Sequence, residues 1–175
     1  MTAVALVPGV LALLPEHASL EDPVADLRSA CGEAVAALGP RVRVVAATGS
    51  GERVGRSLVD AVGAEVVADG SATGVLVVAN GSATRTEKAP GHLDDRAEAF
   101  DAALGAGLRA VDAAALRAVD RGLAAELWAD VGALDVLAGL LEEGTARGSE
   151  ARVLYDDAPF GVQYWVLVCR PTDRS

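Results

Sequence analysis

Three predominantly apolar runs divide the first half of the chain: 3–7, 42–47 and 75–79. Each is bounded by Gly, Pro or polar residues, and none shows a regular alternation of apolar and polar positions. Runs of this kind are typical of parallel strands covered on both faces. We therefore expect strands over these three ranges to be buried neighbours in one sheet.

Apolar residues recur at helical spacing in two further segments. In the first, Pro23 suits the first turn of a helix and Gly39-Pro40 suit its end. In the second, over 94–110, Asp94 or Asp95 is the expected N-cap. The two stripes are Val24, Leu27, Cys31, Ala34 and Leu38, and Leu93, Ala97, Phe100, Leu104 and Leu108.

The remaining segments complete an α/β order. We expect a short helix over 58–62, a weak strand over 64–67, helices within 113–143 with Asp112 as a cap, and a loop over 144–149. One helical stripe joins Leu116, Val119, Leu123 and Leu127, and another joins Leu134, Leu137 and Leu141. Strands over 152–155 and 162–169 form a hairpin. This order predicts one domain over 1–170, a three-layer α/β/α fold with a mixed, mostly parallel central sheet, and a flexible tail over 171–175.

The polar loop over 80–92 is the first functional candidate. It follows the buried run 75–79, and sites in open α/β sheets form where loops leave the carboxyl ends of such strands. The sequence, which has no Ile, indicates a G/C-rich gene, and all its Asn, Lys, Phe and Tyr lie within 80–100 and 155–164. We therefore expect the loop over 80–92 and the turn over 156–161 to lie together at one rim of the sheet. Thr48-Gly49-Ser50-Gly51 lacks the lysine of a P-loop, so we interpret it as an ordinary turn.

Composition excludes several classes of function. The formal charge of −10 argues against nucleic acid and against anionic membranes. Cys31 and Cys169 fall in apolar segments, so buried free thiols are expected rather than a disulfide. The apolar N-terminal stretch has no basic region and is interrupted by Pro8-Gly9, so it is expected to be a core strand rather than a signal peptide. These features predict a cytoplasmic protein.

Three stretches of the chain are similar to one known family. They are Pro8 to Glu16 after the first strand, Val77 to Arg85 running through Ala89-Pro90-Gly91 to Phe100-Asp101, and Tyr155 to Tyr164. Together they resemble the class III extradiol ring-cleavage dioxygenases, in the subunit-B-like family. The resemblance implies the three-layer fold above, with the third stretch as the C-terminal hairpin of the family.

The same resemblance implies an iron site that this sequence does not reproduce. Active members hold non-haem Fe(II) with two histidines and a carboxylate. Where the family has histidine after the first strand, this chain has Pro8 and Gly9, and where the family has Ser-His-Arg it has Ala83-Thr84-Arg85. His17 and His92 are the only histidines and stand at neither place. No metal ligand and no cofactor are therefore expected.

The leading interpretation is a non-catalytic or reassigned relative of that family which binds a small polar or anionic ligand, with Arg85 as its charge partner. One alternative is a ring-cleaving dioxygenase with a relocated metal site. Another is a homo-oligomeric structural subunit in which the helices over 113–143 pack on a second copy and Trp128 is an interface anchor. The candidate pocket residues are Asn80, Ser82, Thr84, Arg85, Lys88, His92, His17, Glu16, Asp156 and Asp157.

Overall fold

A computed structural model describes residues 2–17, 21–143 and 150–170. The strands are β1 (Ala3–Val7), β2 (Arg41–Ala46), β3 (Glu65–Val66), β4 (Gly74–Val78), β5 (Glu150–Asp157) and β6 (Tyr164–Arg170). The α-helices are α1 (Ala25–Ala36), α2 (Gly49–Ala61), α3 (Ala97–Arg109), α4 (Ala113–Arg117), α5 (Arg121–Glu126) and α6 (Leu134–Glu142). Short 3-10 turns are η1 (Leu11–Leu13), η2 (Pro15–His17) and η3 (Pro159–Gly161). The loop expected over 144–149 and the tail expected over 171–175 lie outside the described residues.

The strands form one mixed sheet in the order β3-β2-β4-β1-β6-β5. Strands β3, β2, β4 and β1 are parallel, whereas β6 is antiparallel to β1 and β5 is antiparallel to β6. Strand β4 lies between β2 and β1, so the three apolar runs are neighbours as predicted. The β5–β6 hairpin completes the sheet at one edge, which confirms the prediction of a hairpin.

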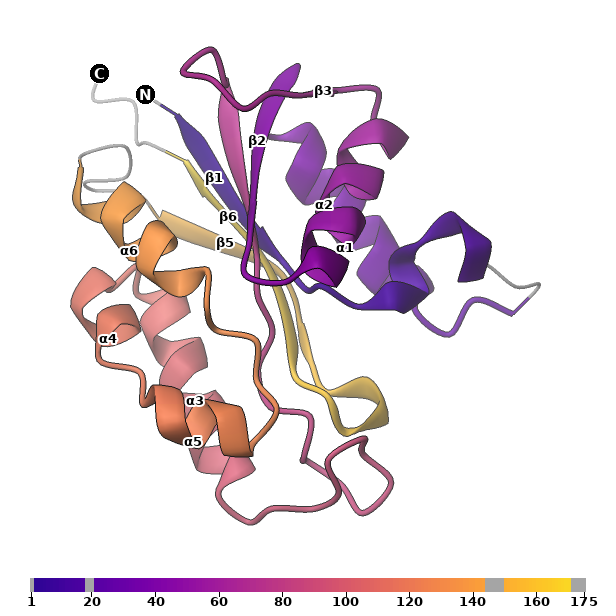
Figure 1. The fold of residues 1–175 in the computed structure, drawn as a ribbon, viewed down its shortest axis with the longest axis vertical. Helices are drawn as coiled ribbons and strands as arrows, with labels where there is room; N and C mark the ends of the chain where they lie inside the picture. The colour runs from indigo at the N-terminus through magenta and orange to yellow at the C-terminus, as the bar shows by residue number, and fades with distance from the viewer. Residues whose placement is uncertain (1, 18–20, 144–149, 171–175) are drawn as a thin grey trace.

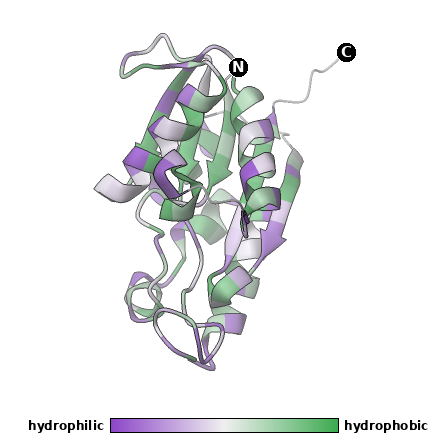
Figure 2. Ribbon diagram, turned by 90° about the vertical axis from the view of Figure 1, so that its right-hand side faces the viewer, coloured by the Kyte–Doolittle hydropathy of each residue, from purple (hydrophilic) through white to green (hydrophobic). Residues whose placement is uncertain are grey.

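Helices cover both faces of this sheet (Figure 1), so the α/β/α prediction is confirmed at the level of layers. Helices α1 and α2 pack on one face, and α3 to α6 pack on the other. Figure 2 shows the hydrophobic strands in the middle, with hydrophilic residues on the outward sides of the helices. In the described part of the chain, no helix combines the length and apolar character needed to cross a membrane.

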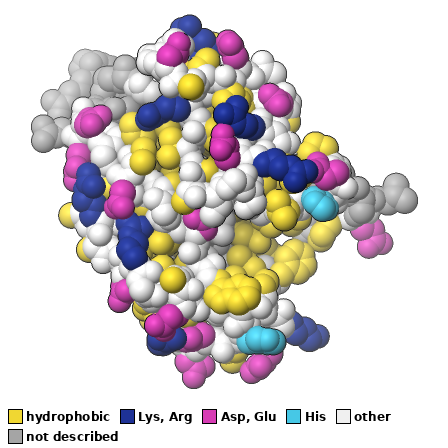
Figure 3. All heavy atoms as spheres, in the orientation of Figure 1, with side chains coloured by type: hydrophobic (Ala, Val, Ile, Leu, Met, Phe, Trp, Pro, Cys, Tyr) yellow, Lys and Arg dark blue, Asp and Glu magenta, His cyan; other side chains and the backbone are white. Residues whose placement is uncertain are grey.

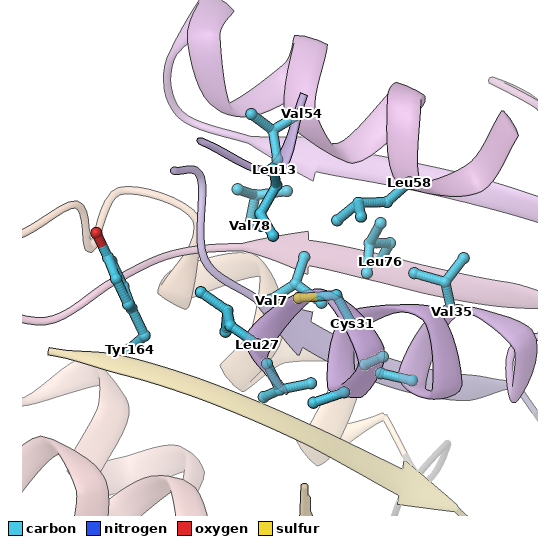
Figure 4. Close-up of a cluster of buried hydrophobic side chains, with 14 of the residues drawn as sticks. Val7, Leu13, Leu27, Cys31, Val35, Val54, Leu58, Leu76, Val78 and Tyr164 are labelled. Carbon is cyan, nitrogen blue, oxygen red and sulfur yellow. The ribbon is translucent and has the colours of Figure 1, made fainter. Parts of the chain in front are cut away.

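The core under α1 and α2 follows the predicted stripe. Val24, Leu27, Cys31, Ala34 and Leu38 are all buried, and Figure 4 shows Leu27 and Cys31 beside residues of β1, β4 and α2. Each buried Leu or Val contributes about 1.5–3 kcal/mol relative to an exposed position. Burial raises the pKa of the Cys31 thiol to about 12.

The second cysteine belongs to the other core. Cys169 on β6 is buried beneath α3 to α6, and burial raises the pKa of its thiol to about 11. Both cysteines are free, which confirms the expectation of two unpaired thiols.

Helix α2 begins nine residues earlier than the helix expected over 58–62. Thr48 is its N-cap, and the Thr48 hydroxyl accepts a hydrogen bond from the Gly51 amide at 3.1 Å. Gly55 faces the sheet so closely that a Cβ there would lie 2.7 Å from Val44 Cγ1. Gly51, which the sequence placed in a turn, and Gly55 are therefore contact residues inside the helix, and they let it approach β2 and β4.

Helix α3 starts at Ala97, three residues later than predicted, and Leu93 lies outside it with 46% of its surface exposed. Asp94 does not cap the helix. Its carboxylate accepts the Arg96 amide at 2.9 Å and so closes a turn before the helix. The predicted stripe is thus wrong at Leu93 and correct for its four later members, which are buried.

The stripe expected from Leu116 to Leu127 belongs to two short helices. Asp112 caps α4 through the Ala115 amide, as predicted, and Asp120 caps α5 through the Leu123 amide. The cap at Asp120 starts a new helix and breaks the predicted continuous one. Val119, in the break, is only partly buried.

Candidate functional site

The carboxyl ends of β1, β2 and β4 meet near the middle of the molecule. The chain leaves β1 and β2 toward the face of α1 and α2, and it leaves β4 toward the opposite face. Neighbouring strands whose connections depart to opposite faces create a topological switch point, where ligands of open α/β sheets bind. Figure 3 shows a hollow with hydrophobic side chains in this part of the view, between the body of the molecule and its lower end.

Four residues from separate loops form a strand-end cluster at this point: Gly9, Thr48, Asn80 and Asp130. The Gly9 amide donates to Asn80 Oδ1 at 2.9 Å, and the Asn80 amide donates to the Asp130 carbonyl at 3.0 Å. The Thr48 hydroxyl lies near enough to the Asp130 carboxylate to lower its pKa. The cluster therefore ties β1, the start of α2, β4 and the segment before α6 together.

Asp130 gives the strand-end cluster its chemistry. The side chain is partly buried, and burial raises its pKa, while the nearby Gly132 amide and Thr48 hydroxyl act in the opposite direction. No ion pair is formed by Asp130 within the described residues. A partly desolvated carboxylate without a cation is an acceptor for a ligand that carries hydrogen-bond donors.

Sequence reasoning missed Asp130. It stands alone in a helix-rich segment, where an aspartate is most often a cap or a solvated side chain. Its signal exists only in space, because the antiparallel bridge between Asn80 and Asp130 joins segments fifty residues apart.

A second polar group, the clamp, holds the loop over 80–92 against α3 and the hairpin. Its centre is Asp101 on α3, which is 3% exposed. The Asp101 carboxylate accepts from the Ser82 amide at 2.8 Å, from the Ser82 hydroxyl at 2.6 Å and from Arg85 at 3.3 Å. These three hydrogen bonds, one of them from a cation, offset the cost of removing the Asp101 carboxylate from water.

The clamp continues into the hairpin through Gln163. Arg85 donates to Gln163 Oε1 at 3.2 Å, and Gln163 Nε2 donates to Asp156 at 2.9 Å. Arg109 then donates to Asp156 at 2.5 Å. The clamp thus consists of Ser82, Arg85, Asp101, Arg109, Asp156 and Gln163. Its charges are balanced among its own members.

Backbone hydrogen bonds place the loop over 80–92 directly against the turn over 156–161. The Arg85 amide donates to the Gly161 carbonyl at 3.0 Å. Ser82 and Gln163 pair through the Gln163 amide and the Ser82 carbonyl at 2.9 Å. The predicted proximity of the two segments is confirmed.

The ten candidate pocket residues do not line one pocket. Asn80 belongs to the strand-end cluster, whereas Ser82, Arg85 and Asp156 belong to the clamp. Thr84 is 1% exposed, and its hydroxyl has no hydrogen-bond partner. The other five are exposed: Glu16, His17, Lys88, His92 and Asp157. Among them, Glu16 forms an ion pair with Arg53.

The residues present do not fit catalytic Fe(II). Pro8, Gly9 and Thr84 stand where the resemblance implies ligands, and none of them supplies an imidazole or a carboxylate. Figure 3 shows the two histidine side chains at well-separated places on the surface. Within residues 2–17, 21–143 and 150–170, no three side chains of His, Cys, Asp or Glu are grouped to hold a metal ion.

Three side chains around the loop over 80–92 belong to residues with left-handed backbone: His92, Trp128 and Phe160, with φ of 60°, 58° and 59°. Trp128 and Phe160 are 61% and 62% exposed. The Trp128 indole lies over Gly91, where a Cβ would be 3.4 Å from Trp128 Cδ2. Such backbone is costly for bulky residues and concentrates at functional sites.

No model of a known protein family matches the sequence, and no curated protein is significantly similar to it. The likeness to the extradiol dioxygenases therefore stays a prediction from the three stretches of sequence.

Proposed function

We propose that this protein is a reassigned relative of the class III extradiol ring-cleavage dioxygenases, with the subunit-B-like fold, which binds a small polar ligand at the strand-end cluster. One observation carries the proposal: loops from four separate elements converge through Gly9, Thr48, Asn80 and Asp130 at the topological switch point.

Asp130 defines the ligand that this site favours. Its carboxylate has no cation within the described residues, so it accepts hydrogen bonds from a ligand that carries hydroxyl, amide or amine donors. Arg85, the expected partner for an anion, donates to Asp101 and Gln163 instead. The proposal therefore relies on Asp130. The expected ligand is one that carries hydrogen-bond donors, and no longer an anion. The exposed Trp128, two residues before Asp130, offers an apolar surface to the same ligand.

The first experiment is a screen of small polyols, amides and amines by NMR on the isotope-labelled protein. We expect hits to shift the amide signals of Gly9, Asn80 and Asp130 together. Asp130→Asn should abolish these shifts, whereas Asp60→Asn on the exposed side of α2 should leave them unchanged. Hits that shift no strand-end signal, or that bind Asp130→Asn equally well, would sink the proposal.

The second experiment addresses the family reaction. Protein purified without added metal or chelator is submitted to elemental analysis, then reconstituted anaerobically with Fe(II) and assayed for oxygen uptake on a panel of catechols. We expect no stoichiometric iron and no oxygen consumption. Iron-dependent turnover lost in His17→Ala or His92→Ala would instead support a ring-cleaving enzyme with a relocated site.

A further inference from the structure

A separate hollow lies on the outer side of the helical layer, between α3 and the α4–α5 pair (Figure 1 shows these helices). Its volume is about 750 Å³, within the range of small-ligand sites. Phe100 and Leu104 are its most buried lining residues and form the floor, and alanines such as Ala99, Ala103 and Ala118 form the walls.

The hollow is a product of the break between α4 and α5. Asp120 caps α5 and so interrupts what would be one helix, which leaves residues 118–120 irregular beside α3. Besides Val119 and Leu123, the apolar side chains of the walls are alanines. A continuous helix with larger side chains would fill the same space.

Direct contacts close the hollow at both ends. At one end, α3 touches α4, since a Cβ on Gly107 would lie 3.2 Å from the Ala115 Cβ. At the other end, Arg96 before α3 forms a 2.7 Å ion pair with Glu126 of α5. About 16 Å of helix axis separates Arg96 from Gly107. A partner helix needs an open-ended groove, so the closed ends favour a small molecule.

The charge at the rim selects the kind of molecule. Asp95 and Asp120 line the rim and form no ion pair within the described residues, although Asp120 also caps α5. Arg96 is the basic residue of the rim, and its guanidinium is already paired with Asp94 and Glu126. The unmatched charge at the rim is therefore negative.

We propose that the hollow between α3 and the α4–α5 pair is a binding site for a small apolar molecule that carries one cationic group. The apolar part lies on Phe100 and Leu104 between the alanine walls, and the cation lies at the rim beside Asp95 and Asp120. This site is distinct from the strand-end cluster, so the two proposals stand or fall separately.

The experiment compares three probes of nearly equal size: 4-phenylbutylamine, 4-phenylbutanol and 4-phenylbutyrate. Binding is followed by NMR titration of the labelled full-length chain. We expect the amine to shift the signals of Ala99, Ala103 and Leu123 and to bind about fivefold tighter than the alcohol, with the acid weakest. Asp120→Asn keeps an N-cap residue but removes one of the two negative charges, so it should reduce the preference for the amine over the alcohol.

Filling the hollow gives the second arm. Ala103→Leu should lower the affinity for all three probes by more than about tenfold. Ala106→Leu, at an exposed position on the same helix outside the hollow, should leave the affinity unchanged. Ala118→Leu repeats the test on the opposite wall in case the first variant folds poorly. The proposal is overturned if no probe shifts these signals, if the acid binds as tightly as the amine, or if the filled variants bind normally. It is also overturned if the chain is a dimer that Ala103→Leu dissociates, because a second copy would then occupy the hollow.

Discussion

The clamp and the strand-end cluster are both polar groups beside the loop over 80–92, and they differ in how their charges are matched. In the clamp, the buried Asp101 accepts three hydrogen bonds, and two arginines balance the carboxylates of Asp101 and Asp156. In the strand-end cluster, the partly buried Asp130 carboxylate lies near the Gly132 amide and the Thr48 hydroxyl, and it has no cation within the described residues. The clamp therefore stabilises the fold, whereas the strand-end cluster contains a carboxylate without a cation that can accept hydrogen bonds from a ligand.

This contrast teaches which polar side chains to regard as functional. Arg85 and Ser82 were candidates because they are polar and follow a buried strand, yet their groups are consumed inside the protein. A polar group is available for binding only when the fold leaves it incompletely satisfied.

The largest expected effect is that of Asp101→Ala, which should lower the free energy of unfolding by about 4 kcal/mol. The substitution leaves the Ser82 amide and hydroxyl buried without an acceptor and removes the ion-pair partner of Arg85. Glu98→Ala, three residues earlier on α3 and exposed, is the matched control, expected to change stability by less than about 0.5 kcal/mol. Urea unfolding measures both, and equal effects would show that the clamp is not a stabilising unit.

Substitutions of Gly81 and Gly9 compare how tightly the backbone is packed beside the clamp and in the strand-end cluster. A Cβ on Gly81 would lie 2.6 Å from Asp101 Oδ1 and 2.8 Å from Gln163 Cβ, so Gly81→Ala should cost about 2–3 kcal/mol. On Gly9, in the strand-end cluster, a Cβ would lie 3.1 Å from Val78 Cγ1, and Gly9→Ala should cost about 1 kcal/mol. Gly70→Ala is the control, because a Cβ there meets nothing within 4 Å. A larger loss at Gly9 than at Gly81 would reverse the comparison.

Phe160 tests the left-handed backbone of the turn beside the loop over 80–92. Because its φ is 59°, Phe160→Gly should be more stable than Phe160→Ala by about 1 kcal/mol. Both variants remove the same exposed ring, so the difference isolates the backbone. Thermal unfolding of the pair measures it, and an advantage for alanine would contradict left-handed backbone at this position.

The smallest effect concerns the pH dependence of Asp130. Its pKa is raised in the folded state, so its contribution to stability is present below the unfolded pKa of about 3.9 and is lost as pH rises through the folded pKa. Asp130→Asn should therefore be more stable than the parent chain at pH 7 by less than about 1 kcal/mol, because water still reaches the side chain. The advantage should shrink at pH 4. Urea unfolding at both values checks this, with Asp60→Asn as control; a variant less stable at pH 7 would show that the carboxylate charge is stabilised in the fold.

Much of the candidate site could be predicted from local patterns, and the rest depended on contacts between distant segments. The loop over 80–92, its neighbour at 156–161 and the strand-end position of Asn80 follow from the order of buried runs and turns. The pairing of Arg85 with Asp101 does not, because it depends on where α3 begins. That start is at Ala97, since Asp94 closes a separate turn before the helix.

Sequence alone determined the three central strands, the hairpin and the α/β/α layers, because these elements follow from the spacing of apolar residues within each segment. Tertiary structure alone decided the early start of α2, where Gly51 and Gly55 serve close packing, and the hollow beside the cap at Asp120. It also decided that Asp130 meets Asn80 and that Arg85 turns inward. The physical reason is the same in each case: these features depend on the space and the partners supplied by another element, and neither is written in the local order of residues.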